Sequence, residues 1–361
     1  MNPSAYSLRV AGFAARLLAW YDAHGRTLPW RRAAPDPWGT WISEVMLQQT
    51  RVEVVRDAWM RFREAFPEPA DFARASDDAL HHAWQGLGYY RRARLLREGA
   101  RQVVERHGGR VPSSLAELGA LAGIGEYTQG AIASIAFGHA VAAVDGNVER
   151  VFARHRAVRE DVKKSATRRV LRQIVEAEID HSRPGDFNQA LMDLGALVCT
   201  PRAPRCAACP VAGDCAARRE GLQEQLPVLP ARRAMVDVSA RVVVIQDAAG
   251  RVLGARTPAG EINQGQVELL GPGLLVDHPA DRDMLAASVF ARHGVQVEVG
   301  DELVRVRHGI THHRVVIHAY RGRLLEPLAL ESADGVVVAA PDDTDVPWST
   351  PARKILQRAR E

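Results

Sequence analysis

The stretch LAGIGEYTQGAIASIAFG, residues 121–138, sets two glycines around one apolar residue and continues in small residues at helical spacing. Gly123 and Gly125 allow a tight turn whose backbone N–H groups point outward at the start of the following helix. Such a turn can hold a phosphate group without reading a base. A glycine pair before a helix is also common as a plain structural turn. The stretch therefore predicts a helical hairpin over about 115–138 and leaves open whether it binds phosphate.

A polar triplet, Asp145-Gly146-Asn147, follows this hairpin inside the stretch VAAVDGNVERV. An aspartate in this position can cap the next helix and have no other role. It can also supply a fixed negative charge beside a reacting group. The local sequence leaves both roles open.

The stretch WISEVMLQQT, residues 41–50, places one carboxylate, Glu44, in the apolar start of a predicted helix. A buried and unpaired carboxylate is costly unless it is protonated, paired or used in chemistry. An apolar pocket raises the pKa of a carboxyl group, and such a group can donate a proton. Glu44 is therefore a candidate general acid.

The four cysteines of the chain fall within seventeen positions, in the pattern C-x6-C-x2-C-x5-C: Cys199, Cys206, Cys209 and Cys215. Because the sequence shows no export signal, clustered thiolates indicate a metal site rather than disulfides. Zinc sites commonly use two short C-x2-C pairs, whereas this chain has one. An iron–sulfur cluster accepts four thiolates from one irregular loop. The spacing favours an iron–sulfur cluster, with zinc and free structural thiols as the alternatives.

The composition is that of a globular, soluble chain of about two domains, with 361 residues, 47% of them hydrophobic and 25% charged. No apolar run reaches membrane-spanning length, and the N-terminal segment lacks a signal-peptide layout, so we expect a cytoplasmic protein without membrane contact. Residues 1–220 carry 31 Lys and Arg against 25 Asp and Glu, and the remainder carries 16 against 18. This modest basic excess is compatible with a polyanionic partner and equally with an ordinary solvated surface.

Helical periodicity dominates residues 1–222, in segments such as SDDALHHAWQGL and ATRRVLRQIVEAEID. Residues 223–235 contain two prolines and no clear period, which predicts a linker. From residue 236 the pattern changes to short β-type runs such as VSARVVVIQ and HHRVVIHAY. We therefore predict a mainly α first domain and a smaller α+β second domain, residues 236–361, with an antiparallel sheet.

Together these motifs resemble a known family, the adenine DNA glycosylases (MutY family) among the helix-hairpin-helix DNA glycosylases. The resemblance covers essentially residues 6–220. Its motifs are LPWR (28–31), SEVMLQQT (43–50), WQGLGYYRRAR (84–94), GIGEYT (123–128), VDGNVERV (144–151) and FNQALMDLGALVCTPRAPRC (187–206). The resemblance implies one four-iron–four-sulfur (4Fe-4S) cluster on the four cysteines. It also implies a monomeric base excision repair enzyme that removes adenine mispaired with 8-oxoguanine, and with guanine, from double-stranded DNA.

The resemblance also implies roles for single residues. Glu44 matches the residue that protonates adenine N7, and Asp145 matches the one that stabilises the oxocarbenium ion. Tyr127 and Asn147 match residues that orient these two groups. The residues implied for the adenine pocket are Leu28, Trp30, Arg31, Val52, Gln189 and Met192, and those implied for DNA contacts are Gln48, Gln49, Thr50, Tyr89, Gly123 and Gly125. Among the latter, Gln49 and Tyr89 match wedge residues that fill the gap left by the adenine.

Residues 236–361 resemble, more weakly, the Nudix-like C-terminal domain of the same family. The glutamate-rich helix of Nudix hydrolases is missing from the sequence, so magnesium-dependent pyrophosphate hydrolysis is not expected. The segment VRHGITHHRVVIHAY matches a hairpin that reads 8-oxoguanine, which implies this role for Thr311 and His312. Its four histidines could also indicate a metal site, but a strand hairpin facing DNA phosphate is the favoured interpretation.

Two rival functions are compatible with part of the pattern. A bifunctional lyase of the endonuclease III type, acting on oxidised pyrimidines, would share the hairpin and the cysteines. It needs a catalytic lysine where this chain has Tyr127, and all three lysines of the chain lie outside the hairpin. A noncatalytic DNA-binding protein would not need Glu44 and Asp145 together. The sequence therefore favours a monofunctional DNA N-glycosylase.

Overall fold

The computed structural model describes residues 10–31, 34, 36–231, 234–326, 335–343 and 346–360. The chain divides into two compact units. The first comprises Met1–Ala75 and Gly86–Ala231, and the second comprises Ser76–Gln85 and Arg232–Glu361. None of the described helices combines the length and the apolarity that crossing a membrane requires.

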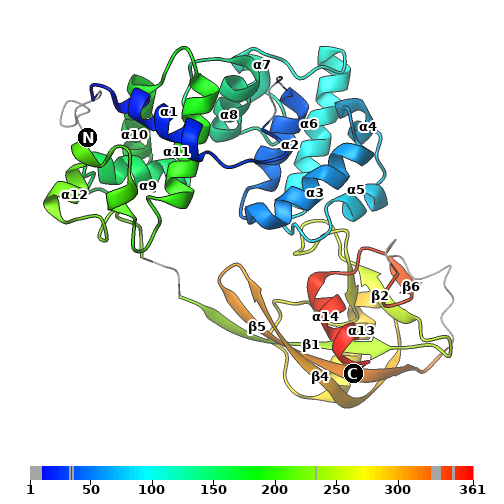
Figure 1. Ribbon diagram of the computed structural model, residues 1–361. Coiled ribbons are helices and arrows are strands. Elements are labelled where there is room, and N and C mark those ends of the chain that lie inside the picture. Colours follow the sequence, from blue (N-terminus) through cyan, green and yellow to red (C-terminus); the bar gives the residue numbers. More distant parts are fainter. Residues whose placement is uncertain are drawn as a thin grey trace. The chain divides into compact units, whose positions relative to one another are not determined.

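The first unit is built from helices joined by loops (Figure 1). They are α1 (Phe13–His24), α2 (Pro37–Met46), α3 (Val52–Ala65), α4 (Pro69–Ala73), α6 (Arg91–His107), α7 (Leu115–Gly119), α8 (Glu126–Phe137), α9 (Gly146–His155), α10 (Ser165–Glu178), α11 (Pro184–Leu197) and α12 (Ala216–Glu220). Two 3₁₀ turns, η2 (Cys206–Ala208) and η3 (Ala212–Asp214), lie in the cysteine-bearing loop. The prediction of a mainly α first domain is confirmed.

A core of buried apolar residues joins α1, α9, α10 and α11. Phe152 on α9 and Phe187 on α11 are fully buried, and the Phe13 ring of α1 lies 5.3 Å from the Phe152 ring. Burial of large side chains is the main source of stability in such a core. The core therefore anchors α9, which begins directly after Asp145, and α11, which packs closely against Asn147.

The predicted hairpin corresponds to α7 and α8. Ser114 caps α7 by accepting the Glu117 N–H at 3.3 Å, and Gly123 in the turn adopts a φ of 79°. Glycine adopts this left-handed conformation without the steric cost of a side chain. Helix α8 is rich in small residues and closely approaches the segment before α9. A Cβ atom added at Gly130 would collide with the Ala142 carbonyl oxygen.

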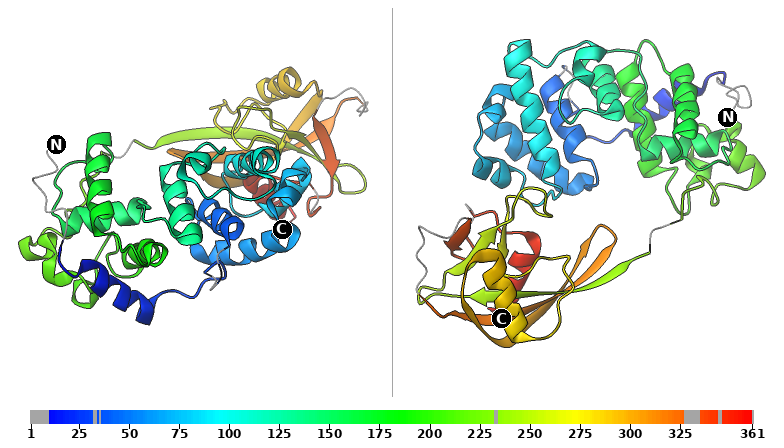
Figure 2. Two further views of the ribbon diagram at one scale, coloured as in Figure 1. Left: turned by 90° about the horizontal axis from the view of Figure 1, so that it is seen from above. Right: turned by 180° about the vertical axis from the view of Figure 1, so that it is seen from behind.

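The second unit is an α+β arrangement, and its described residues form two three-stranded sheets. Figures 1 and 2 show its strands and helices. Its elements are α5 (Asp77–Ala83), β1 (Val236–Ile245), β2 (Val252–Arg256), β3 (Val267–Leu269), α13 (Arg282–His293), β4 (Val297–Ile310), β5 (His313–Leu324), β6 (Val336–Ala339) and α14 (Thr350–Arg358). The strand orders are β1-β5-β4 and β3-β2-β6. Helices α14 and α13 contribute to two separate buried cores. The α+β prediction for the C-terminal part is confirmed.

The prediction of an antiparallel sheet is wrong for one pair of strands. β4 and β5 form an antiparallel hairpin, and β2 is antiparallel to both of its neighbours. β1 and β5, however, run parallel, with Val236 opposite His313. A parallel pair needs a long crossover, and the chain between β1 and β5 supplies it. Alternating hydrophobicity defines the two faces of a strand and says nothing of its partner, so the local pattern could not reveal this pairing.

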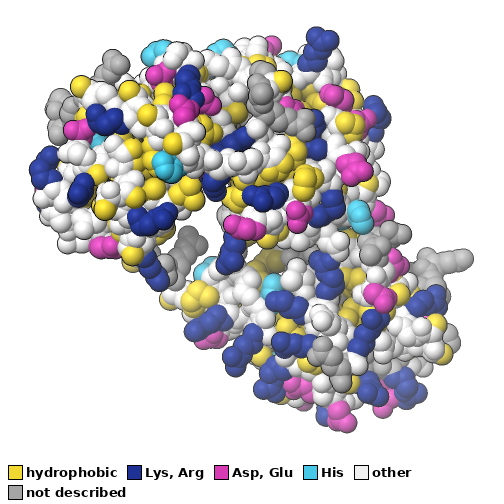
Figure 3. Space-filling model, viewed as in Figure 1, with side chains coloured by type: hydrophobic (Ala, Val, Ile, Leu, Met, Phe, Trp, Pro, Cys, Tyr) yellow, Lys and Arg dark blue, Asp and Glu magenta, His cyan; other side chains and the backbone are white. Residues whose placement is uncertain are grey.

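Charged side chains are dispersed over the surface. On the face shown in Figure 3, Lys and Arg side chains lie over each unit, with Asp and Glu side chains among them. Several arginines are paired, for example Arg183 with Asp22 at 2.6 Å. Charge alone therefore does not locate a functional surface.

Candidate active site

A pocket of about 630 Å³ in the first unit is lined by residues of α2, α8, α9 and α11 and of the segments beside them. Pockets for small molecules typically measure about 300–1,000 Å³. Predicted site residues from distant parts of the sequence line this one pocket: Leu28, Trp30, Arg31, Glu44, Gln48, Gln49, Thr50, Val52, Tyr127, Asp145, Asn147, Gln189 and Met192. The structure thus brings together all four residues predicted for catalysis and all six predicted for the substrate.

Helix α2 carries Glu44 into the interior. Asp36 caps the helix by accepting the Gly39 N–H at 2.8 Å, and Pro37 occupies the first helical position. Every residue from Trp38 to Met46 is buried. A helix with apolar residues on all sides is expected in a core, so its one carboxylate has little access to water.

Glu44 is 5% exposed, and the Tyr127 hydroxyl donates a hydrogen bond of 2.5 Å to its Oε2 atom. Burial raises the pKa of Glu44 to about 7, against the lowering effect of the Tyr127 hydrogen bond. The negative charge of Asp145 raises this pKa further, and the positive charge of Arg31 lowers it. Near pH 7 a substantial fraction of Glu44 therefore retains its proton.

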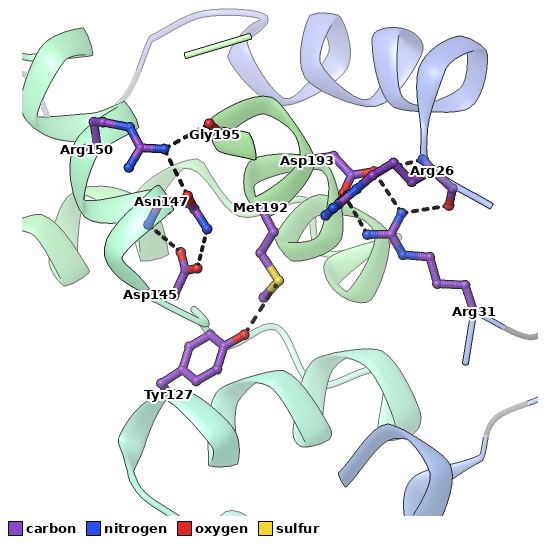
Figure 4. Close-up of polar contacts among 9 residues, drawn as sticks. All are labelled: Arg26, Arg31, Tyr127, Asp145, Asn147, Arg150, Met192, Asp193 and Gly195. Carbon is purple, nitrogen blue, oxygen red and sulfur yellow. Dashed lines mark hydrogen bonds and ion pairs between the residues drawn. The ribbon is translucent and has the colours of Figure 1, made fainter. Parts of the chain in front are cut away.

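Asp145 is the N-cap of α9. Its Oδ1 atom accepts the backbone N–H groups of Asn147 at 2.9 Å and Val148 at 2.8 Å, and its Oδ2 atom accepts Asn147 Nδ2–H at 2.7 Å (Figure 4). Burial raises the pKa of Asp145 above its usual value, and these hydrogen bonds offset only part of that rise. Asp145 both caps a helix and lines the pocket, so the two roles left open by the sequence are compatible.

Asn147 is held by Arg150, one turn further along α9 (Figure 4). Arg150 Nη2 donates to Asn147 Oδ1 at 2.9 Å and to the Gly195 carbonyl at 2.8 Å, and Arg150 Nε donates to the Cys199 carbonyl at 2.8 Å. Helices α9 and α11 are so close that a Cβ atom added at Gly195 of α11 would lie 2.6 Å from Asn147 Cβ of α9. Sequence reasoning missed Arg150, although its spacing of three residues from Asn147 could have revealed it.

A second polar cluster surrounds Asp193, a fully buried residue of α11 (Figure 4). Its carboxylate accepts two hydrogen bonds of 2.8 Å from Arg31, and bonds of 2.9 and 2.8 Å from the backbone N–H and Nε of Arg26. Burial acts to raise the pKa of Asp193, but the two arginines hold it below its usual value. Arg26 and Asp193 were missed because their pairing joins residues 167 positions apart.

The chain is similar to known proteins in its sequence and in its fold. A family model described as HhH-GPD superfamily base excision DNA repair protein matches residues 42–177. The adenine DNA glycosylase of Homo sapiens is 48% identical over 225 residues, which cover 60% of this chain and 41% of that protein. The adenine DNA glycosylase of Mycobacterium tuberculosis (strain ATCC 25618 / H37Rv) is 40% identical over 205 residues, which cover 57% of this chain and 67% of that protein. The chain belongs to the adenine DNA glycosylase family.

This assignment confirms the family resemblance seen in the sequence. The chain spans less than half of the length of the human adenine DNA glycosylase. A solved structure of a thermostable thymine-DNA glycosylase is 28% identical, with a TM-score of 0.52, over 58% of this chain and 95% of that chain. This likeness supports the helical glycosylase fold.

Four of the residues that the adenine DNA glycosylase family resemblance predicts to contact DNA lie near the ends of helices in the first unit. Gln49 and Tyr89 are exposed, Tyr89 at 52%, and adopt left-handed φ values of 60° and 47°. Gln49 follows α2, and Tyr89 precedes α6. Gly123 and Gly125 lie in the turn between α7 and α8. Neither glycine lines the pocket, and Tyr89 does not line it either.

Two further predicted DNA contacts of this family member belong to the second unit. Thr311 and His312 form the turn of the β4–β5 hairpin, where Thr311 adopts a φ of 53°. The His312 and His313 rings lie 4.1 Å apart between centroids. This turn places a hydroxyl and imidazole groups at the tip of a hairpin.

The four cysteines line one small cavity of about 30 Å³, together with apolar residues such as Val151 and Leu194: Cys199, Cys206, Cys209 and Cys215. Arg154 is buried beside them and donates from Nη1 to Cys199 Sγ at 3.4 Å. Four soft donors around one cavity, with a guanidinium against a sulfur, fit a thiolate-bound iron–sulfur cluster. Within the described residues, no three His, Cys, Asp or Glu side chains stand as the ligands of a single ion would.

Proposed function

We propose that this protein is a monofunctional adenine DNA glycosylase of base excision repair. Its substrate would be double-stranded DNA with adenine opposite 8-oxoguanine or guanine. It would work as a monomer in the bacterial cytoplasm, where the chromosome lies. The observation that carries this proposal is that Glu44 and Asp145 line one pocket in unlike surroundings.

Glu44 is suited to protonate the leaving base. Adenine leaves poorly as an anion, so its release needs a proton donor. With a pKa of about 7, a substantial fraction of Glu44 holds a proton at neutral pH, and the group also gives that proton up readily. The Tyr127 hydroxyl occupies Oε2, so we assign the transferred proton to Oε1. The apolar surroundings on α2 would exclude water from this step.

Asp145 is suited to stabilise the cationic sugar that remains. Its three N–H donors favour the charged form of the carboxyl group. Its charge is also one cause of the raised pKa of Glu44, so an ionised Asp145 helps to keep Glu44 protonated. One protonated and one ionised carboxyl group is the pair that most glycosidases use to cleave a glycosidic bond.

The cations in the pocket argue for base release without strand cleavage. A lyase needs an amine that attacks the sugar, and the described residues that line this pocket include arginines and no lysine. Lys163 lies in an adjoining pocket beside Asp145, where Nζ pairs with Glu149 Oε2 at 2.6 Å. The Lys163 amine is thus engaged by a carboxylate.

The remaining lining residues suit a purine. Leu28, Trp30 and Val52 supply apolar walls, and the amide of Gln189 can hydrogen-bond to a base edge. Drawing adenine out of the duplex costs a few kcal/mol of unstacking. In our proposal the exposed side chains of Gln49 and Tyr89 fill the gap.

The four cysteines would hold a four-iron–four-sulfur cluster: Cys199, Cys206, Cys209 and Cys215. When bound, the cluster would maintain the loop between α11 and α12 and take no part in bond breaking. Protein prepared without oxygen should contain about four irons per chain. Stoichiometric zinc without iron would contradict this assignment.

A base-release assay tests the function. Single-turnover reactions would use three duplexes, with adenine opposite 8-oxoguanine, with adenine opposite guanine, or with thymine glycol. Each reaction would be analysed for free base, and for strand breaks before and after alkali. We expect adenine release from the first two, with strand breaks only after alkali. Glu44→Gln should abolish release and still bind the lesion duplex, because it removes only the proton donor.

Other outcomes identify the rivals. Release of thymine glycol with strand breaks before alkali would indicate an endonuclease III-like lyase. Binding of all duplexes without any base release would indicate a noncatalytic protein. Excision by Glu44→Gln at the wild-type rate would remove Glu44 from the mechanism.

A further inference from the structure

Arg92, the second residue of α6, binds the end of α2 through a buried guanidinium. It is 9% exposed. Its Nη1 atom donates to the carbonyl oxygens of Val45 at 2.8 Å and Met46 at 2.9 Å, and to that of Gln48. The last carbonyls of a helix have no partner within the helix, and a cation at this end is favourable. Arg92 therefore secures the end of the helix that carries Glu44.

The other arm of Arg92 binds the loop before α6. Nη2 donates to the carbonyl oxygens of Leu87 at 2.9 Å and Gly88 at 3.2 Å, and to Thr50 Oγ1 at 3.1 Å. Thr50 Oγ1 also bonds the Leu87 carbonyl at 3.2 Å. One side chain thus ties the segment after α2 to the segment before α6.

These contacts surround the two predicted wedge residues. Gln49 directly follows Gln48, and Tyr89 directly follows Gly88, so each comes after a carbonyl that Arg92 binds. Both residues adopt left-handed φ values, which persist only where the surroundings impose them. The Arg92 guanidinium also lies 5.6 Å from the centroid of the Tyr89 ring.

The chemistry of these contacts requires arginine. A guanidinium is planar and offers donors in a fixed fork, whereas a lysine ammonium is a single compact group with three donors. A lysine at position 92 would keep the charge and could not reach both segments at once. Methionine would keep the bulk of the stem and supply no donor.

We infer that Arg92 is a positioning residue that holds Gln49 and Tyr89 in register with Glu44, so that insertion of the wedge delivers adenine to its acid. This inference rests on the proposed function. It goes further by assigning to one buried side chain the coupling between base extrusion and proton transfer. Arg92 itself does not line the pocket.

Fluorescence of 2-aminopurine, placed at the adenine position opposite guanine, measures extrusion separately from chemistry. The full chain with Glu44→Gln should bind this duplex and show a rise in emission as the base leaves the stack. Adding Arg92→Lys should reduce this rise at least threefold, while the dissociation constant for the duplex changes less than threefold. Arg92→Met should show the larger effect. In the protein that keeps the native Glu44, Arg92→Lys should slow single-turnover adenine release at least tenfold.

Arg101→Met is the matched control. Arg101 also lies on α6, and its Nε donates to the Ala73 carbonyl at 3.1 Å. This variant removes the same charge and one arginine–carbonyl bond and should leave emission and release unchanged. Thermal melting of each variant reports on the fold.

The outcomes separate the two proposals. If the Glu44→Gln protein shows the emission rise, and neither Arg92→Lys nor Arg92→Met reduces it, the inference about Arg92 is overturned. The proposed function would stand. The inference also fails if both Arg92 variants lose emission only in proportion to lost duplex binding and a lower melting temperature, because Arg92 would then serve the fold generally. No emission rise with Glu44→Gln, together with no adenine release by the wild type, would reject the proposed function and the inference with it.

Discussion

At the scale of single residues, the pKa of Glu44 reflects influences that substitutions can remove one at a time. Burial raises it, the Tyr127 hydrogen bond lowers it, and the charge of Asp145 raises it. Catalysis by a general acid needs the protonated form, so the rate should fall as pH rises through the pKa. For the wild type this places the alkaline fall near pH 7.

Tyr127→Phe should move this alkaline fall to higher pH. The variant deletes the hydrogen bond that lowers the pKa of Glu44, so Glu44 keeps its proton further into the alkaline range. The height of the profile should also drop, because Tyr127 orients the acid. Single-turnover adenine release across the neutral range checks the position of the fall. A fall that stays in place, or moves to lower pH, would contradict the assignment of the acid to Glu44.

At the scale of elements, α11 presents two aspartates in different surroundings. Asp193 is fully buried between Arg26 and Arg31, whereas Asp186 forms an exposed ion pair with Arg183 at 2.8 Å. Removing one partner of a buried ion pair costs about 3–5 kcal/mol, because a charge is left unpaired. An exposed pair contributes about 0–1 kcal/mol.

Asp193→Asn should therefore destabilise the protein and slow adenine release at least tenfold, since Arg26 and Arg31 both line the pocket. Asp186→Asn, on the same helix, should change unfolding by less than about 1 kcal/mol and leave the rate unaltered. Urea unfolding and single-turnover release measure the two effects. Equal effects of the two substitutions would show that the buried cluster has no special role in the pocket.

These elements also show what the sequence could predict. Glu44 was predictable because its apolar neighbours lie beside it in the chain, and Asp145 because a cap precedes its own helix. The pairing of Asp193 with Arg31 was not predictable, because 162 positions separate the two residues and only the folded chain brings them together. The parallel pairing of β1 with β5 was missed for the same reason. Local patterns define elements and their faces, and contacts between distant segments need the fold.

At the scale of the whole molecule, the proposed chemistry lies in the first unit and the predicted reading of the lesion lies in the second. 8-Oxoguanine differs from guanine by an N7 hydrogen and an 8-oxo group. One hydrogen bond of this kind is worth about 1–3 kcal/mol, or roughly tenfold to hundredfold in discrimination. The turn of the β4–β5 hairpin carries a hydroxyl that can make such a bond, that of Thr311.

Thr311→Val should therefore reduce the preference for adenine opposite 8-oxoguanine over adenine opposite guanine by about tenfold or more. Valine keeps the branched shape in the left-handed position and deletes the hydroxyl. Release from the duplex with guanine should change little, which serves as the internal control. His312→Ala should be tested alone and in combination, because His312 can supply another donor. If the double variant discriminates as well as the wild type, reading of the lesion belongs to the first unit.

The spacing between the two proposed reacting carboxyl groups depends on two glycines, which have no side chain. Gly130 lets α8 approach the segment that leads to Asp145, and Gly195 lets α11 approach Asn147. Even alanine would collide with the Ala142 carbonyl oxygen at position 130, or with Asn147 at position 195, and would force the neighbouring backbone to move. In a survey of every single substitution, these glycines should tolerate change as poorly as the carboxyls themselves. A harmful allele could thus arise at a position that contacts neither DNA nor metal, and a map of ligand contacts would fail to mark it.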